Sequence, residues 1–498
     1  MLTRSTKKCI CLFIALLFCV CTAMPATALD VTEQDMPFYH IDNMARTVLS
    51  KARIPGAAIV VVQGEDVRYL SYGSDLQTKQ SVYEDALFQI GSVSKAFTAL
   101  GILLLVDEGK LSLDDPVCKQ IPWFTVTIRG NEVAPEDLTI ANLLYQTSGF
   151  TNNDSLYPQA EPDVTLEEHI KSISNKELSF YPSERYSYAN ANYKLMGYII
   201  EVVSGQDYAQ FMEQRIFTPL GLNATYANPQ KALETGLVAQ GSRVAFFSAR
   251  PYPVEVAKGN VPAGFLYSSA RDMGRWLQIQ MGTVEVSPQF SRIIQKSHAV
   301  EQSGRVDAST YYAGGWFVTD TGEIYHPGGT PNYSAKLGIK PNNTAVGVLT
   351  NINASANTGG ICDNALAIVN GEPIVPYTAD VWTVFDLIFS MMTFVCVPLC
   401  VLAIIYVATA VSQTKKGLRK RRAYRTGGAI LAATLPALLS LAMLVIIPVI
   451  FQSTWQGLLV WAPYSIVFGI ASFCVASILL LVVTITAQTC PKVLVRDL

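Results

Sequence analysis

Two side chains three residues apart, Ser92 and Lys95, begin a long apolar stretch, GSVSKAFTALGILLLVDEG. Residues at this spacing share one face of a helix, so the hydroxyl and the amine point the same way. A serine at the start of a helix lies among unpaired backbone N–H groups, which can hold an oxyanion. A lysine that leaves water loses its charge more readily and can then act as the base that the serine needs. The pair predicts a nucleophile with its base, although a helix cap beside a solvent-reaching lysine has the same pattern.

Two later stretches supply further candidate residues. In YSYANANYKL, Tyr188 can relay a proton beside an ammonium group, and Asn190 can donate a hydrogen bond to a substrate carbonyl. In YHPGGTPNYS, His326 can hydrogen-bond a substrate, and the glycine pair ending at Gly329 lets a ligand approach the strand. Taken singly, each stretch is equally well explained by packing or by a turn. Together the stretches give the candidate catalytic residues Ser92, Lys95 and Tyr188 and the candidate substrate-binding residues Asn190, His326 and Gly329.

The elements that must position these residues follow from the periodicity. Gly56–Gly73 contains two β-rich runs around a turn at 63–66, which indicates a hairpin. Three more short runs, GEIYHPGG, YSAKLGIKP and TAVGVLTNI, have short connections and favour antiparallel strands, and Pro327 indicates an edge strand because it lacks an N–H. Ser92–Glu108 is nearly all apolar and stops at Gly109, as a buried central helix does. The predicted class is α+β, with an antiparallel sheet made from both chain ends, flanking helices and an inserted helical lobe.

Both ends of the chain are strongly apolar. Half of the 498 residues are hydrophobic and 15% are charged, and the apolar excess lies at the N-terminus and beyond about Val381. Residues 1–28 combine a basic start, an apolar run and small residues at Ala26–Ala28. This pattern is typical of a cleaved secretory signal, with an uncleaved anchor as the alternative. Each of three later apolar runs has the roughly 20 residues that a membrane-spanning helix needs.

A basic segment between the first two of these runs sets the predicted topology. It carries seven lysines and arginines and no acidic residue, and short loops of this kind stay in the cytoplasm. Together with the signal, this loop places the large N-terminal domain outside the cytoplasmic membrane of a multi-pass protein. The predicted segments are a signal peptide at 1–28, an extracytoplasmic domain at 29–375, membrane helices at 376–411, 429–451 and 458–487, a cytoplasmic loop at 412–428 and a cytoplasmic tail at 488–498.

Charge and cysteine content bound the function further. Outside the basic loop, 30 Lys and Arg residues stand against 39 Asp and Glu residues, so nucleic-acid binding is not expected. Cys118 and Cys362 are the cysteines of the exported part and could form one disulfide. Four histidines without ligand spacing give no metal site, and we expect no cofactor. Asp386, inside the first apolar run, lies either at the outer headgroups, which we favour, or at an internal polar contact.

The three motifs occur in the order and at the long spacings of a known family. S-x-x-K followed by a second polar motif and a strand motif is found in β-lactamases and penicillin-binding proteins. The sequence resembles the serine β-lactamase-related family, on the branch of class C β-lactamases, D,D-peptidases and esterases. Blocks such as LTIANLLYQTSGF, FTPLGLNATY and AGGWFV extend the resemblance over nearly the whole exported domain. The resemblance implies a β-lactamase-like fold and a serine hydrolase that forms an acyl-enzyme, with its oxyanion held by the N–H groups of Ser92 and Gly329.

The order of signal, exported domain and three spans is similar to that of membrane-bound prodrug-activating peptidases, the colibactin-maturing peptidases among them. That resemblance implies cleavage of an amide or ester in a small peptide-like substrate by a protein whose other partner is the lipid bilayer. A D,D-peptidase, D-alanyl esterase or β-lactamase acting on cell-wall-related substrates is the alternative with the same chemistry. A β-lactam-binding sensor is the alternative of another class, and the oligomeric state is left open.

The sequence departs from the family pattern at several positions. Gln146 stands where many relatives carry histidine, and we expect it to be structural. His326 stands where β-lactamases carry a lysine that helps to hold the drug's carboxylate, which weakens a strict β-lactamase interpretation. Asn260 and Thr330 differ from the residues that contact the leader in the colibactin-maturing peptidases, so a preference for D-asparagine does not carry over.

Overall fold

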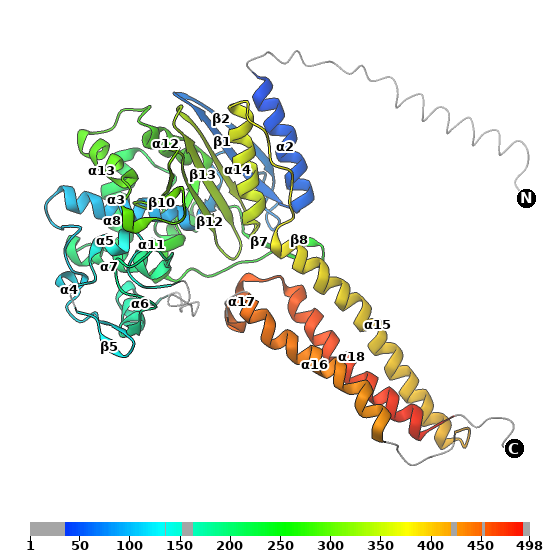
Figure 1. The fold of residues 1–498 in the computed structure, drawn as a ribbon. Helices are drawn as coiled ribbons and strands as arrows, with labels where there is room; N and C mark the ends of the chain where they lie inside the picture. Colours follow the sequence, from blue (N-terminus) through cyan, green and yellow to red (C-terminus); the bar gives the residue numbers. More distant parts are fainter. Residues whose placement is uncertain (1–34, 135, 152–162, 420–425, 451–453, 492–498) are drawn as a thin grey trace, which may run out of the picture.

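The computed structural model describes residues 35–134, 136–151, 163–419, 426–450 and 454–491. The predicted signal peptide lies outside these ranges, as do parts of the basic loop and of the tail. A seven-stranded antiparallel sheet of order β10-β11-β12-β13-β14-β1-β2 is the centre of the domain that precedes α15 Val381–Lys415, called the N-terminal domain from here on (Figure 1). Strands β1 and β2 form the predicted hairpin. Because β1 also pairs with β14, the sheet is built from both ends of the domain, as expected.

The bounds of the strands in this sheet are β1 Gly56–Gln63, β2 Asp66–Gly73, β10 Thr310–Tyr312, β11 Phe317–Thr319, β12 Ile324–Gly329, β13 Ser334–Lys340 and β14 Thr344–Thr350. The smaller sheets contain β3 Leu87–Gln89 with β9 Tyr267–Ser269, β4 Val126–Ile128 with β5 Asn131–Glu132 and β6 Lys176–Glu177, and β7 Ser242–Ala245 with β8 Ser248–Pro251. The α-helices described in the N-terminal domain are α2 Met36–Ala52, α3 Ser94–Asp107, α4 Val117–Gln120, α5 Ile140–Leu144, α6 Leu166–Ile173, α7 Asn190–Ser204, α8 Tyr208–Met212, α9 Thr218–Leu220, α10 Pro229–Glu234, α11 Val261–Gly264, α12 Ala270–Met281, α13 Pro288–His298 and α14 Ser355–Val369.

Strand β1 contributes to two hydrophobic cores, because its side chains alternate between the faces of the sheet. Ile59 and Val61 pack with α2 and α14 on one face, whereas Val60 and Val62 pack with α3 and α12 on the other. A strand that is covered on both faces is apolar throughout. The sheet is therefore the middle layer, and the helical lobe with α3 lies on the second face (Figure 1).

Helix α3 is the central helix of this lobe. Every residue from Ser94 to Leu105 is buried, and a helix without a polar face must be enclosed by other elements. Helices α7, α11 and α13 contact it. Helix α7 ends at Gly205 in the left-handed conformation, with φ of 70°, as its sequence predicts. The helical middle of the domain is thus confirmed.

The prediction of an edge strand at Pro327 was wrong for the sheet as a whole. Strand β12 lies inside the sheet, and β10 is the outermost strand on that side. However, β11 pairs with β12 only at Ile324 and Tyr325, whereas β13 pairs along β12 as far as Gly329. The half of β12 that begins at His326 therefore has a strand on one side only, and its other side contacts the turn before α3.

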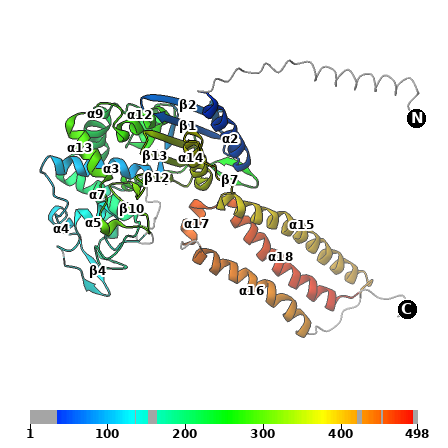
Figure 2. The ribbon, with the colours of Figure 1, turned by 45° about the horizontal axis from the view of Figure 1, so that its top comes forward.

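In the described residues, four helices follow the N-terminal domain: α15 Val381–Lys415, α16 Thr426–Ile450, α17 Trp455–Trp461 and α18 Tyr464–Thr489. Helices α15 and α18 are long and apolar enough to cross a membrane. A third span is counted only if the end of α16 and the short α17 form one bent span, so the predicted three-helix bundle stays a prediction. Helix α18 lies beside both α15 and α16 (Figures 1 and 2). The third apolar run, predicted at 458–487, is divided before Tyr464, where Pro463 precedes the new helix.

Asp386 makes an internal polar contact, the alternative to the favoured placement at the headgroups, which stays a prediction. Its side chain is fully buried, and its two carboxylate oxygens accept the backbone N–H groups of Phe246 and Phe247 at 2.8 and 2.7 Å. Both phenylalanines have positive φ, 51° and 61°, as two-residue hairpin turns require. The carboxylate on α15 thus binds the tip of the β7–β8 hairpin of the N-terminal domain.

Arg243, in the same hairpin, makes a second contact with the C-terminal helices. Its buried guanidinium donates to the carbonyls of Leu459 and Ala462 at 3.1 and 3.0 Å, at the C-terminal end of α17, where carbonyl groups lack helical partners. It lies 3.8 and 3.1 Å from the ring centres of Tyr252 and Tyr464. The hairpin therefore joins the N-terminal domain to α15, α17 and α18. The possible disulfide between Cys118 and Cys362 is not formed. Both side chains are thiols, and Cys362 is buried against the Val346 carbonyl.

Replacing Asp386 with leucine should release the hairpin tip, because the half-buried N–H groups of Phe246 and Phe247 lose their buried acceptor, at a cost of about 1–3 kcal/mol. We expect amide hydrogen exchange of the 242–251 segment to accelerate about five- to hundredfold, as measured by mass spectrometry on the full chain in nanodiscs. Asp363→Leu, at an exposed carboxylate on α14 that pairs with Lys336, is the matched control. Unchanged exchange of the hairpin in Asp386→Leu would contradict the joint.

Candidate active site

A short helical turn, η1 (Gly91–Val93), places Ser92 directly before α3. Gly91 has φ of 54°, which favours glycine. A Cβ atom on Gly91 would collide with the amide nitrogen of Gly329, and one on Gly328 would collide with the carbonyl oxygen of Ile90. Glycine is required on both sides because strand β12 packs backbone to backbone against the turn. This contact places the amide of Gly329 next to the residue that precedes Ser92.

The amine of Lys95 lies at the centre of the candidate site. Its Nζ atom lies 3.1 Å from Ser92 Oγ, within hydrogen-bond distance, and donates to Asn190 Oδ1 at 2.7 Å and to the carbonyl of Ala263 at 2.5 Å. The Lys95 side chain has no solvent exposure, whereas Ser92 is partly exposed. The predicted nucleophile and base are therefore in hydrogen-bond contact, and the hydroxyl can be reached from outside.

Burial lowers the pKa of Lys95 well below 10.5, and the like charge of Lys194 lowers it further. The three oxygens around the amine are neutral, and no described carboxylate forms an ion pair with it. Without a counter-charge, the desolvated ammonium is disfavoured. The arrangement thus favours a neutral amine, which is the form that can accept a proton from a hydroxyl.

Tyr188 brings its ring to the same amine. Lys95 Nζ lies 4.8 Å from the centre of the Tyr188 ring. The ring stacks on Phe317 at 6.5 Å and meets Tyr312 edge-on at 5.9 Å. Strands β10 and β11 therefore hold a residue that belongs to the distant second motif. The predicted convergence of hydroxyl, amine and phenol-bearing ring is observed.

Gln146 holds the second motif in place. Its backbone has φ of 61°, and its side-chain oxygen accepts the N–H of Ala189 at 2.9 Å and the amide of Asn192 at 2.5 Å. These residues flank Asn190, whose own oxygen binds Lys95. The expected structural role of Gln146 agrees with these contacts.

His326 lies next to Tyr188 but is enclosed. Its ring is 6.1 Å from that of Tyr188 and is only 1% exposed. Its Nδ1 contacts the Pro327 carbonyl at 2.6 Å, and its Nε2 contacts the Tyr312 hydroxyl at 3.2 Å. Burial lowers the pKa of His326 to about 3, and the charge of Lys95 contributes to the shift. A neutral imidazole that donates to the Pro327 carbonyl accepts from Tyr312, so His326 supplies no positive charge here.

Several residues of the site were missed in the sequence. The Ala263 carbonyl, held where Thr98 donates to the neighbouring Pro262 carbonyl at 2.7 Å, is a backbone atom and leaves no motif. Lys194 is buried one turn beyond Asn190 and contacts His169 Nε2 at 3.0 Å. A lysine four residues after Asn190, on the same face of an apolar helix, was the available signal.

Comparison with known proteins agrees with this geometry. The family described as "Beta-lactamase" matches residues 41–370. The chain belongs to the beta-lactamase family. It is therefore a member of a family of serine hydrolases and of penicillin-binding protein homologues, and its fold is β-lactamase-like.

The relatives include proteins from bacteria and an archaeon. "Protein flp" of Staphylococcus aureus (strain MW2) is 28% identical over 456 residues, which are 88% of each chain. "Penicillin-binding protein 4" of Amycolatopsis lactamdurans is 30% identical over 292 residues, covering 56% of this chain and 75% of its own. The octameric penicillin-binding protein homologue from Pyrococcus abyssi has a similar structure, with a TM-score of 0.59 and 26% identity over 67% of this chain and 78% of that chain. The match to Protein flp is longer than the family match.

We expect Gln146→Met to disturb the site without touching it. The change removes the acceptor of two buried donors, so thermal stability should fall by about 1–3 kcal/mol, and displacement of Asn190 should slow acylation of Ser92. Gln146→His, which restores an acceptor, should recover much of both. Thermal unfolding and acylation rate are the measurements, and a Gln146→Met protein equal to the parent in both would contradict the positioning role.

Proposed function

We propose that the protein is a membrane-anchored extracytoplasmic serine hydrolase that forms an acyl-enzyme on Ser92. The observation that carries this proposal is the contact between Ser92 Oγ and a Lys95 amine that is buried without a described carboxylate partner. A hydroxyl needs a base to become a nucleophile at neutral pH. A lysine of lowered pKa supplies it.

The proposed reaction has two stages. Ser92 Oγ attacks an amide or ester carbonyl while the neutral amine of Lys95 takes the hydroxyl proton. The negative oxygen of the tetrahedral intermediate is held by the N–H groups of Ser92 and Gly329. The proton passes through Lys95 and Tyr188 to the departing amine or alcohol, and the C–N or C–O bond breaks. Water then attacks the acyl-enzyme, giving up its proton to the same base, and releases the acid and Ser92.

Asn190 is assigned to bind the substrate, and His326 is assigned to shape the part of the site beside Tyr188. Asn190 binds Lys95 through its oxygen, which leaves its amide nitrogen to donate to a substrate carbonyl. His326 is neutral and buried, so it can shape the Tyr188 side of the site but cannot attract a carboxylate by charge. This favours a peptide-like amide or ester over a β-lactam whose carboxylate must be held by a cation.

Within this chemistry we place a prodrug-activating peptidase first, because the predicted signal, exported domain and membrane helices fit an enzyme that acts after export. A D,D-peptidase or D-alanyl esterase of the cell wall is the second candidate, and the names of the penicillin-binding relatives favour it. The anchoring rests on α15 and α18, which are long and apolar enough to span a bilayer.

Ser92→Ala should abolish covalent labelling by a fluorophosphonate probe, because the only change is the loss of the attacking oxygen. The measurements are intact mass and peptide mapping of the full chain in detergent. Ser94→Ala, two residues further on at the start of α3, is the control. Labelling that persists at another residue would overturn the assignment. A β-lactam-binding sensor keeps its acyl group and does not turn over. If an amide or ester substrate yields more molecules of product than there are molecules of enzyme, the sensor is excluded.

A further inference from the structure

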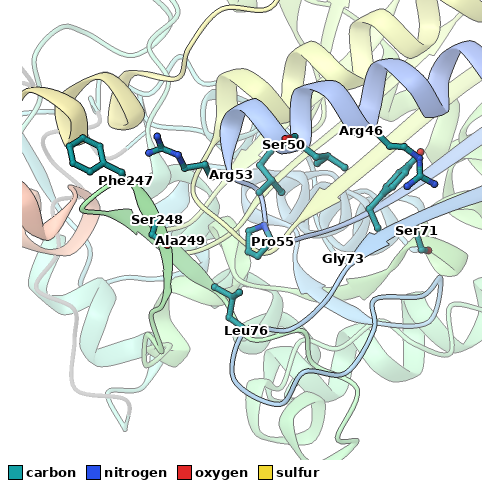
Figure 3. Close-up of a pocket in the computed structure, with 13 residues that line it drawn as sticks. Arg46, Ser50, Arg53, Pro55, Ser71, Gly73, Leu76, Phe247, Ser248 and Ala249 are labelled. Carbon is teal, nitrogen blue, oxygen red and sulfur yellow. The ribbon is translucent and has the colours of Figure 1, made fainter. Parts of the chain in front are cut away.

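A groove of about 790 Å³ lies away from Ser92, between the end of α2, the edge strand β2 and the β7–β8 hairpin. Its walls combine cationic, hydroxyl and apolar side chains, among them Arg46, Ser50, Arg53, Leu76 and Phe247. Figure 3 shows Arg53 extending from the end of α2 toward Phe247, whereas Arg46 lies at the other end of the groove. The groove plays no part in the proposed reaction.

The two arginines differ in how their charge is balanced. Arg46 forms an ion pair with Asp42 at 2.9 Å and lies over the ring of Tyr72. Arg53 is exposed and has no ion pair with any described carboxylate, and its closest ring contact is Phe247 at 5.8 Å. A guanidinium group that is left unbalanced beside a groove is a suitable partner for an anion, and its planar fork matches phosphate oxygens.

The position of Arg53 relative to the C-terminal helices identifies the source of the anion. Phe247 stacks on Phe394 of α15 at 5.9 Å, and the neighbouring Phe246 meets Phe468 of α18 at 5.6 Å. The hairpin tip is therefore seated among side chains of the two helices that can span a membrane. Arg53 lies 5.8 Å from the ring of Phe247 at this tip, so the proposed membrane anchoring puts its guanidinium near the surface of the bilayer.

A second cation of α2 lies near the start of α15. Lys51, also on the last turn of α2, lies 5.6 Å from the ring of Tyr377, four residues before α15 begins. Lys51 is exposed and has no ion pair with any described carboxylate. The end of α2 thus presents two cations where the chain enters the membrane, which is the arrangement that attracts anionic lipid headgroups.

We propose that Arg53 and this groove bind the phosphate headgroup of an anionic glycerophospholipid in the outer leaflet. The guanidinium holds the phosphate, Ser50 offers a hydroxyl, and Phe247 lies beside the glycerol and the first carbons of the acyl chains. The bound lipid fastens the N-terminal domain to the bilayer surface next to the β7–β8 joint. The site rests on the proposed membrane anchoring and is independent of the proposed chemistry at Ser92.

The test is lipid-induced thermal stabilisation of the full chain, purified from membranes in a neutral detergent. Phosphatidylglycerol, phosphatidylcholine and glycerol 1-phosphate are added separately to the parent, Arg53→Gln, Arg53→Lys and Arg129→Gln. Arg129 is a matched control because it is also exposed, has positive φ and has no described ion-pair partner, but it lies on the β4–β5 turn of the helical lobe.

We expect phosphatidylglycerol to stabilise the parent, Arg53→Lys and Arg129→Gln, and phosphatidylcholine to have little effect. Arg53→Gln should bind phosphatidylglycerol about fivefold more weakly, as loss of one interfacial cation predicts. Equal stabilisation of Arg53→Gln and the parent would overturn the proposal, as would glycerol 1-phosphate acting as strongly as the lipid. Recovery of the parent chain in the soluble fraction would instead contradict the anchoring itself.

Discussion

The burial of the Lys95 amine is the constraint on which the site depends. An ammonium group that leaves water without a counter-ion is disfavoured, and the oxygens of Ser92, Asn190 and Ala263 that surround this amine are all neutral. The surroundings explain how such a group is held: α3 is enclosed along its length, and aromatic rings close the side that faces Tyr188. Neutralising the amine is the least costly response, and a neutral amine beside a hydroxyl is a base beside a nucleophile. Structure and proposed chemistry are thus two consequences of one desolvated group.

The sheet turns this local arrangement into a site by bringing distant parts of the chain together. Strands β10 to β12, which lie late in the N-terminal domain, hold the ring of Tyr188 and pack Gly328 and Gly329 against the turn before Ser92. Gln146 fixes the second motif because its side-chain oxygen accepts hydrogen bonds from the backbone N–H of Ala189 and the side-chain amide of Asn192. Each catalytic candidate is therefore supported by residues from another segment, as a preorganised site requires. The β7–β8 hairpin contacts the C-terminal helices through the hydrogen bonds of Asp386 and Arg243.

The sequence predicted those features that depend on spacing within one segment. The pairing of Ser92 with Lys95 follows from the helical repeat, and the β1–β2 hairpin and the end of α7 follow from turn and capping residues. The approach of Tyr188 joins segments about a hundred residues apart, and it was anticipated only because the motif order resembles a known family. Features that depend on backbone atoms were not predicted. The Ala263 carbonyl and the N–H groups that bind Asp386 have no side-chain signature.

The most direct test of this account is the pH dependence of acylation of Ser92 by a neutral ester, measured in single turnover with the full chain in detergent. The base must be unprotonated, so the rate should rise with pH through the pKa of Lys95 and level off above it. Because that pKa is lowered well below 10.5, we predict that the rate levels off well before the pH reaches that value. A rate that keeps rising up to the ordinary pKa of lysine would show that the amine is protonated at neutral pH and would contradict the account.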